Sequence, residues 1–145
     1  MAPASKSSVK KTMRSFFSTS AKPTDAELAI LQILWEHQPV SVRDVNDLLN
    51  AQEVQKGLEG AIGYTTTLKI MQIMAEKGLV RRDESNKTHL YSATVSREET
   101  QKALLGKFMD AVFHGSPMQL VMQALGNYSP SKEEMKEIQK LLKSK

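Results

Sequence analysis

The chain has 145 residues with 20 basic and 16 acidic side chains, a length that suits one domain and a small addition. It contains no cysteine, which excludes disulfide bridges, thiolate metal sites and a cysteine nucleophile and agrees with a reducing cytosol. No run approaches the roughly 18 apolar residues of a membrane-spanning helix, so we expect a soluble, cytoplasmic protein without membrane insertion.

The basic residues are concentrated in two stretches. Residues 1–22 contain five basic and no acidic side chains, whereas the rest of the chain contains 15 basic and 16 acidic ones. Residues 23–63 contain two basic and seven acidic side chains, and residues 64–93 contain five basic and three acidic ones. Any attraction to nucleic acid must therefore come from a local part of the surface, and the charge distribution indicates residues 64–93 as that part.

Residues 1–22 combine lysine, serine and alanine with little apolar bulk. This composition is typical of a disordered basic arm, because charge without apolar burial does not fold. The composition also resembles a mitochondrial presequence, which is the less favoured interpretation.

Two helices are expected between residues 24 and 50. Thr24 and Glu27 form a capping box at the start of the first helix, and Pro39 follows its end. Val40 is predicted to be a short strand, and Ser41 caps the second helix. Residues 50–63 are polar, contain three glycines and are predicted to form a long turn. The expected inward-facing residues are Leu28, Leu31, Leu34 and Trp35 on the first helix, and Val42, Val45, Leu48 and Leu49 on the second.

A third helix over residues 65–77 and a hairpin are expected next. Gly78 is placed to end this helix in a left-handed conformation, and residues 79–82 and 88–93 are predicted strands joined by a polar turn. A helical wheel places two different sets of residues on opposite faces. The expected buried face contains Tyr64, Leu68, Met71, Met74 and Ala75, and the exposed face contains Thr65, Thr66, Lys69 and Ile73, with Gln72 and Lys77 at its edges.

Two interpretations of this helix and hairpin are open. Short hydroxyls and a lysine on an exposed face, followed by a basic hairpin, suit a winged helix-turn-helix. In that fold the helix enters the major groove, and the hairpin lies along the backbone or minor groove. In the other interpretation the polar face is only solvated. The order of three helices and then a hairpin favours the winged helix.

Three further helices are predicted after residue 95. The first is capped by Ser96 and ends at His114-Gly115, the second runs from Ser116-Pro117 to Gly126, and the third follows Ser129-Pro130. A segment of this size cannot bury its own apolar faces, so it needs a partner. A second copy would place two recognition helices on a palindromic site. The expected interface residues are Leu104, Phe108, Val112, Phe113, Leu120, Val121, Leu125, Ile138 and Leu141.

The sequence contains no catalytic, phosphate-binding or metal motif. His37, His89 and His114 are isolated, and none has the spacing of metal ligands. The most that is expected of His89, on the second predicted strand, is a contact with phosphate. We therefore predict no enzyme activity, no metal or other cofactor, and no small-molecule ligand.

The segments PTDAELAILQILW, SVRDVNDLL, YTTTLKIMQIMAEKGLVRR and HLYSA, in this order, resemble the penicillinase repressor family (the BlaI/MecI/CopY type) over residues 23–145. The resemblance implies a mainly α, bacterial, homodimeric repressor that binds a double-stranded DNA operator. It implies a winged-helix DNA-binding domain over residues 23–95 and a helical dimerisation domain over residues 96–145. The residues expected at the DNA are Arg43, Thr65, Thr66, Lys69, Gln72, Ile73, Arg81, Lys87 and His89.

This chain departs from the family pattern at several places. Ile73 falls where many members have arginine, so it either contacts a thymine methyl group or contributes nothing. In antibiotic-response members a protease signal leads to cleavage before a phenylalanine that matches Phe108. The preceding residue here is Lys107 instead of asparagine, so control by a signalling protease stays open. The paired cysteines of copper-responsive members are absent. The alternative function is a winged-helix module that binds protein and not DNA.

Overall fold

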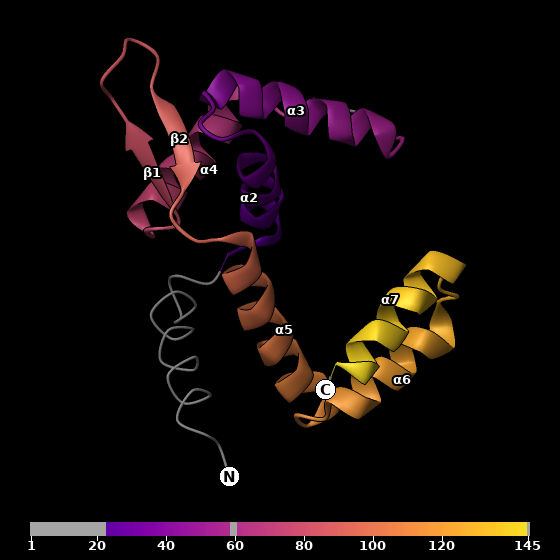
Figure 1. Cartoon of the computed structure of the whole chain (residues 1–145). Helices are drawn as coiled ribbons and strands as arrows, with labels where there is room; N and C mark the ends of the chain where they lie inside the picture. Colours follow the sequence, from indigo (N-terminus) through magenta and orange to yellow (C-terminus); the bar gives the residue numbers. More distant parts are fainter. Residues whose placement is uncertain (1–22, 59–60, 145) are drawn as a thin grey trace. The chain divides into compact units, whose positions relative to one another are not determined.

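The computed structural model describes residues 23–58 and 61–144, so the arm predicted for residues 1–22 lies outside the described part. The chain divides into two compact units, with the boundary inside one helix between Ala103 and Leu104. Its elements (Figure 1) are α2 (Asp25–His37), α3 (Val42–Gln55), α4 (Tyr64–Glu76), β1 (Val80–Asp83), β2 (Leu90–Ala93), α5 (Arg97–Phe113), α6 (Pro117–Asn127) and α7 (Lys132–Lys143). The mainly α fold class with a winged helix is confirmed. None of the helices described is long and apolar enough to cross a bilayer.

The first unit has a single apolar core around α2. This helix contacts α3, α4 and β2, so it is buried on more than the one stripe that the sequence predicted. Ile30 and Ile33 are buried, whereas Leu28 and Trp35 are only half-buried. The core consists of Ile30, Leu31, Ile33, Leu34, Val40, Val42, Val45, Leu49, Met71, Met74, Leu79, Val80, Tyr91 and Val95.

The predicted capping box at the start of α2 also joins α2 to α4. The Thr24 hydroxyl accepts the Glu27 N–H at 3.1 Å, and Glu27 Oε1 accepts the Thr24 N–H at 2.8 Å. Glu27 is only 3% exposed, and its Oε1 also lies 2.8 Å from Lys77 Nζ at the C-cap of α4. Because a buried carboxylate needs such partners, this cluster fixes the end of α4 against the start of α2.

The polar stretch after residue 50 is not the long turn that the sequence predicted, because α3 continues to Gln55. Two asparagines of α3 then hold the segment that leads into α4. Asn50 donates to the Ile62 carbonyl at 3.0 Å and accepts the Ile62 N–H at 2.6 Å. Asn46 donates to the same carbonyl at 3.0 Å and to the Thr67 hydroxyl at 2.8 Å. These bonds fix the position of the backbone at Ile62, and with it the start of α4.

The rotation of α4 differs from the helical-wheel prediction. Thr67 is fully buried together with Met71 and Met74, whereas Tyr64 and Ala75 are exposed and Leu68 is half-buried. The bond from Asn46 satisfies the Thr67 hydroxyl inside the core, so a threonine can be buried at this position. The predicted exposed residues Thr65, Thr66, Lys69 and Ile73 are exposed.

The end of α4 is set by Gly78, as predicted. Gly78 has a positive φ of 82°, which favours glycine. Its N–H bonds to the Ala75 carbonyl and the Leu79 N–H bonds to the Met74 carbonyl, the two bonds of a Schellman motif. The chain then turns directly into the hairpin.

The hairpin pairs Val80 with Ala93 and Asp83 with Leu90 in antiparallel register. The strands predicted over residues 79–82 and 88–93 are therefore displaced or too long. His89 precedes β2 and lies in the loop, not on a strand as predicted. Val40 bridges to Tyr91 through two backbone bonds of 3.1 and 2.8 Å, so its predicted short strand is confirmed as a single bridge.

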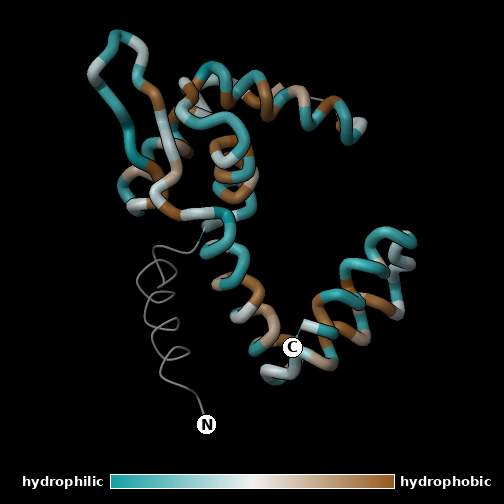
Figure 2. Tube along the Cα trace, viewed as in Figure 1, coloured by the Kyte–Doolittle hydropathy of each residue, from teal (hydrophilic) through white to brown (hydrophobic). Residues whose placement is uncertain are grey.

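The second unit contains no buried residue between 104 and 144. Hydrophobic residues recur along α6 and α7 (Figure 2), and many are solvent-exposed. Two boundaries differ from the prediction: α6 continues through Gly126 to Asn127, and Ser131, not Ser129, caps α7. The large exposed apolar side chains are Leu105, Phe108, Val112, Met118, Val121, Met122, Leu125, Tyr128, Met135, Leu141 and Leu142.

Asn46→Ala should lower the free energy of unfolding of the first unit by about 1–3 kcal/mol, because it leaves the buried Thr67 hydroxyl and the Ile62 carbonyl without this donor. Denaturant unfolding followed by the fluorescence of Trp35 measures this loss. Asp47→Ala, one residue further on the exposed side of α3, is the control and should change stability by less than about 0.5 kcal/mol. Equal stability of both variants would contradict the assigned role of the Asn46 amide.

Candidate nucleic-acid interface

The N-terminus of α4 is open to solvent. Its N-cap is Gly63, and no side chain caps it. The first N–H groups of a helix without a side-chain cap remain available to an anion and carry partial positive charge. Thr65, Thr66, Lys69 and Ile73 lie exposed on the same helix. This end of α4 thus offers donors, hydroxyls and one lysine to a polyanion.

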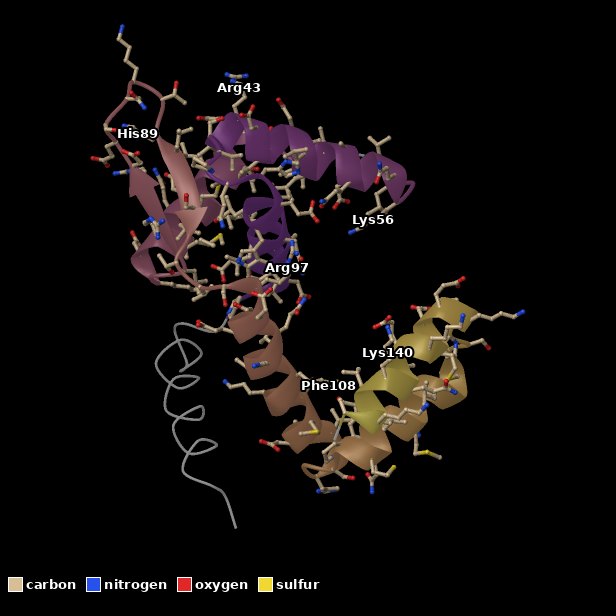
Figure 3. All side chains as sticks on the ribbon, in the orientation of Figure 1. Arg43, Lys56, His89, Arg97, Phe108 and Lys140 are labelled. Carbon is tan, nitrogen blue, oxygen red and sulfur yellow. The ribbon has the colours of Figure 1, made fainter. Side chains whose placement is uncertain are left out.

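A groove of about 690 Å³ lies beside this helix. It brings together side chains from the start of α3, from α4 and from the hairpin, and Figure 3 labels Arg43 on α3 and His89 near β2. Four of the predicted DNA-contacting residues, namely Arg43, Gln72, Lys87 and His89, line it. The sequence did not predict Ser41, Val42, Tyr64, Leu68, Arg82, Thr88 and Tyr91, which complete the lining.

Tyr64 is the main residue that the sequence analysis placed wrongly. The Arg43 guanidinium lies 5.6 Å from the centre of the Tyr64 ring, within the range of a cation–π interaction. This contact joins the first turn of α3 to the first turn of α4, and 45% of Tyr64 is exposed. The sequence does show a tyrosine at the start of this helix. Whether its side chain points into the core or into the groove depends on the rotation of α4, which the sequence pattern did not give.

The hairpin contributes its cations unequally. Arg82 pairs with Glu84, and hydrogen bonding with Tyr91, followed by that with Glu84, raises the pKa of its guanidinium. Because residues alternate along a strand, Arg81 lies on the opposite face from Arg82, and it does not line the groove. The Ser85 side chain and N–H lower the pKa of the Asp83 carboxyl and organise the turn that carries Lys87.

Three cations of α4 and the hairpin differ from Lys77 in their ion pairing. In the part of the chain that the structure describes, Lys69, Arg81 and Lys87 have no ion-pair partner, whereas Lys77 is paired with Glu27. A lysine without an internal partner can neutralise a phosphate without losing an existing bond. The positive charge available to a polyanion thus comes from α4 and the hairpin. No group of three or more metal-ligating side chains occurs in residues 23–58 or 61–144.

Comparison with known proteins identifies the family. The model of a family described as penicillinase repressor matches residues 23–144. The chain belongs to the penicillinase repressor family. The resemblance inferred from the sequence is thereby confirmed, and so is the prediction that the chain is not an enzyme, because the relatives with which it aligns are repressors and regulators.

Three relatives are similar to this chain at low identity. Two are proteins of Mycobacterium tuberculosis named transcriptional regulator BlaI, from strains CDC 1551 and H37Rv, 29% identical over 82 residues, which is 56% of this chain and 54% of theirs. The chain thus spans about half the length of these regulators. The penicillinase repressor of Bacillus licheniformis is 22% identical over 121 residues, 82% of this chain and 88% of its own length.

Lys87→Ala should weaken binding to a random-sequence DNA duplex and reduce the slope of log K against log salt by about one, because one phosphate contact is lost. Titrations at several salt concentrations measure this slope. The matched control is Lys56→Ala, at the opposite end of α3 from Arg43 (Figure 3), which should leave the slope unchanged. The same slope in all three proteins would remove the hairpin from the interface.

Proposed function

We propose that this chain is a homodimeric, sequence-specific transcriptional repressor that binds a palindromic operator in the bacterial cytoplasm. The observation that supports this most strongly is the exposed polar face of α4, held outward by the buried Thr67 beside the groove lined by Arg43, Lys87 and His89. A major groove is wide enough for one helix, and α4 is the helix with this face.

In the proposed complex each element of the first unit has a separate role. The start of α4 enters the major groove, where Thr65 and Thr66 reach base edges and Lys69 reaches phosphate or guanine. Arg43 and the loop that carries Lys87 and His89 hold the sugar-phosphate backbone on the groove side, and Arg81 approaches the backbone from the other face of the hairpin. Contacts to phosphate position the protein, and contacts to bases supply the sequence preference.

The second unit is proposed to be the dimerisation domain. Phe108 and Phe113 form an edge-to-face pair with centroids 5.8 Å apart, yet 51% of Phe108 and 53% of Val112 remain exposed. Exposed apolar surface of this kind is typical of an interface. A second copy would cover it and place two α4 helices on a symmetric site. The predicted set from Leu104 to Leu141 contains no residue that the chain itself buries.

Control by a signalling protease is a further part of the proposal. The bond between Lys107 and Phe108 lies inside α5. A helical bond does not fit the extended form that proteases bind, so cleavage there would require local unwinding. Separation of the dimerisation helices would then release the operator, because each first unit alone holds only one half-site.

Thr66→Ala and Lys69→Ala should separate base recognition from phosphate binding. Loss of a base contact by Thr66 should cost about 1–3 kcal/mol on a duplex selected from a random library and little on unselected DNA. Loss of Lys69, if its partner is phosphate, should weaken binding to both duplexes alike. Parental affinity of both variants on both duplexes would remove α4 from the DNA and favour a protein-binding module.

Phe108→Ala should weaken dimerisation by about 2 kcal/mol or more, as expected for an aromatic residue central to an interface. Sedimentation measures the dimer, and the fluorescence of Trp35, whose Nε1 donates to the Val95 carbonyl at 2.9 Å, monitors unfolding of the first unit. The first unit should unfold as in the parent, while affinity for the selected duplex falls. Tyr128→Ala is the control, because Tyr128 is a 76% exposed aromatic outside the predicted interface. Retained dimer in Phe108→Ala would place the interface elsewhere.

A further inference from the structure

We propose that Ile73 is a specificity-determining residue that recognises the C5-methyl group of a thymine in the major groove. This inference rests on the proposed DNA binding by α4 and states what part of the operator that helix recognises. Ile73 is the one large aliphatic residue among the exposed positions of α4, and 37% of it is exposed.

Ile73 lies on the same face of α4 as the proposed base-contacting residue Thr66. Seven residues separate the two, so at 100° per residue they lie within about 20° of each other around the helix. Lys69 lies between them along the helix and is also exposed. The separation along the axis is about 10 Å, which corresponds to at most about three base pairs. Ile73 is therefore placed to reach the groove floor together with Thr66.

The orientation of Ile73 is fixed by its neighbours. Met71 and Met74 on either side of it along the chain are fully buried, and both ends of α4 are held, by Asn46 at Thr67 and by Glu27 at Lys77. The β-branched isoleucine side chain itself has few rotamers in a helix. Little conformational freedom would therefore be lost when Ile73 is brought against a base, and this favours discrimination.

The chemistry of the major groove leaves one partner for an aliphatic side chain. Guanine, cytosine and adenine present hydrogen-bonding groups there, and thymine alone adds a methyl group. An isoleucine offers no donor or acceptor, so it desolvates a base edge without replacing the lost bonds, which disfavours the polar edges. Contact with a methyl group is favourable by the burial of apolar surface. Ile73 should therefore select a T·A pair that lies within about three base pairs of the base pair contacted by Thr66.

The test begins with a duplex selected by this chain from a random library. Each thymine of that duplex is then replaced by deoxyuridine, which removes only the methyl group. One replacement, in a single half-site, should weaken binding of the parent protein about fourfold, the equivalent of one buried CH₂ group. Ile73→Ala should bind the thymine duplex more weakly and should no longer distinguish it from the deoxyuridine duplex. Val54→Ala, an aliphatic residue 73% exposed on α3, is the matched control and should keep the fourfold preference.

The outcomes distinguish failure of the proposed DNA-binding function from failure of the inference about Ile73. If no sequence is enriched from the library, the proposed function fails and Ile73 has no role at DNA. If a sequence is enriched but no deoxyuridine replacement weakens binding of the parent protein, the inference about Ile73 is overturned while the proposed function stands. The same holds if Ile73→Ala retains the fourfold preference. The measurement on the parent protein needs no variant, so the folding of Ile73→Ala does not limit the test.

Discussion

The amide of Asn46 determines which face of α4 meets the solvent. Its two bonds, to the Ile62 carbonyl and the Thr67 hydroxyl, place a polar residue inside an apolar core without an unsatisfied group. A buried hydrogen bond of this kind contributes modestly to stability, but leaving the hydroxyl unpaired is costly. A rotation of α4 that broke the bond would therefore be penalised, and the face with Thr65, Thr66, Lys69 and Ile73 remains outward. The proposed function depends on this one rotational choice.

The end of α4 is fixed as firmly as its start, and this places the hairpin. Glu27 holds Lys77, Gly78 closes the helix, and the Thr94 N–H bonds to the Leu79 carbonyl at 2.9 Å. The hairpin thus leaves α4 in a defined direction, and its loop residues Lys87 and His89 reach the same groove as Arg43. A surface assembled from three elements in this way needs little rearrangement to meet a rigid duplex, and less ordering entropy opposes binding.

Local signals carried most of the fold prediction, and long-range bonds account for the errors. The caps at Thr24, Ser41 and Ser96 and the stop at Gly78 act within a few residues, so the sequence showed them. The wheel placed Tyr64 on the buried face and did not assign Thr67 to it. The partner that buries Thr67 lies 21 residues away, beyond any local pattern. The exposed face of α4 follows from the spacing of residues within one helix, so it was predictable. The Arg43–Tyr64 contact and the hydrogen bond of Arg82 with Tyr91 join different elements, so they were not.

Hydroxyl-radical footprinting of this chain on a selected duplex tests whether a symmetric dimer binds the DNA through α4. Two α4 helices related by a two-fold axis should enter successive major grooves on one face of the DNA. We expect two protected patches of equal size on a palindromic sequence, centred about 34–36 Å apart or a multiple of that distance. A single patch, or protection without a two-fold relation, would contradict the proposed dimer on its operator.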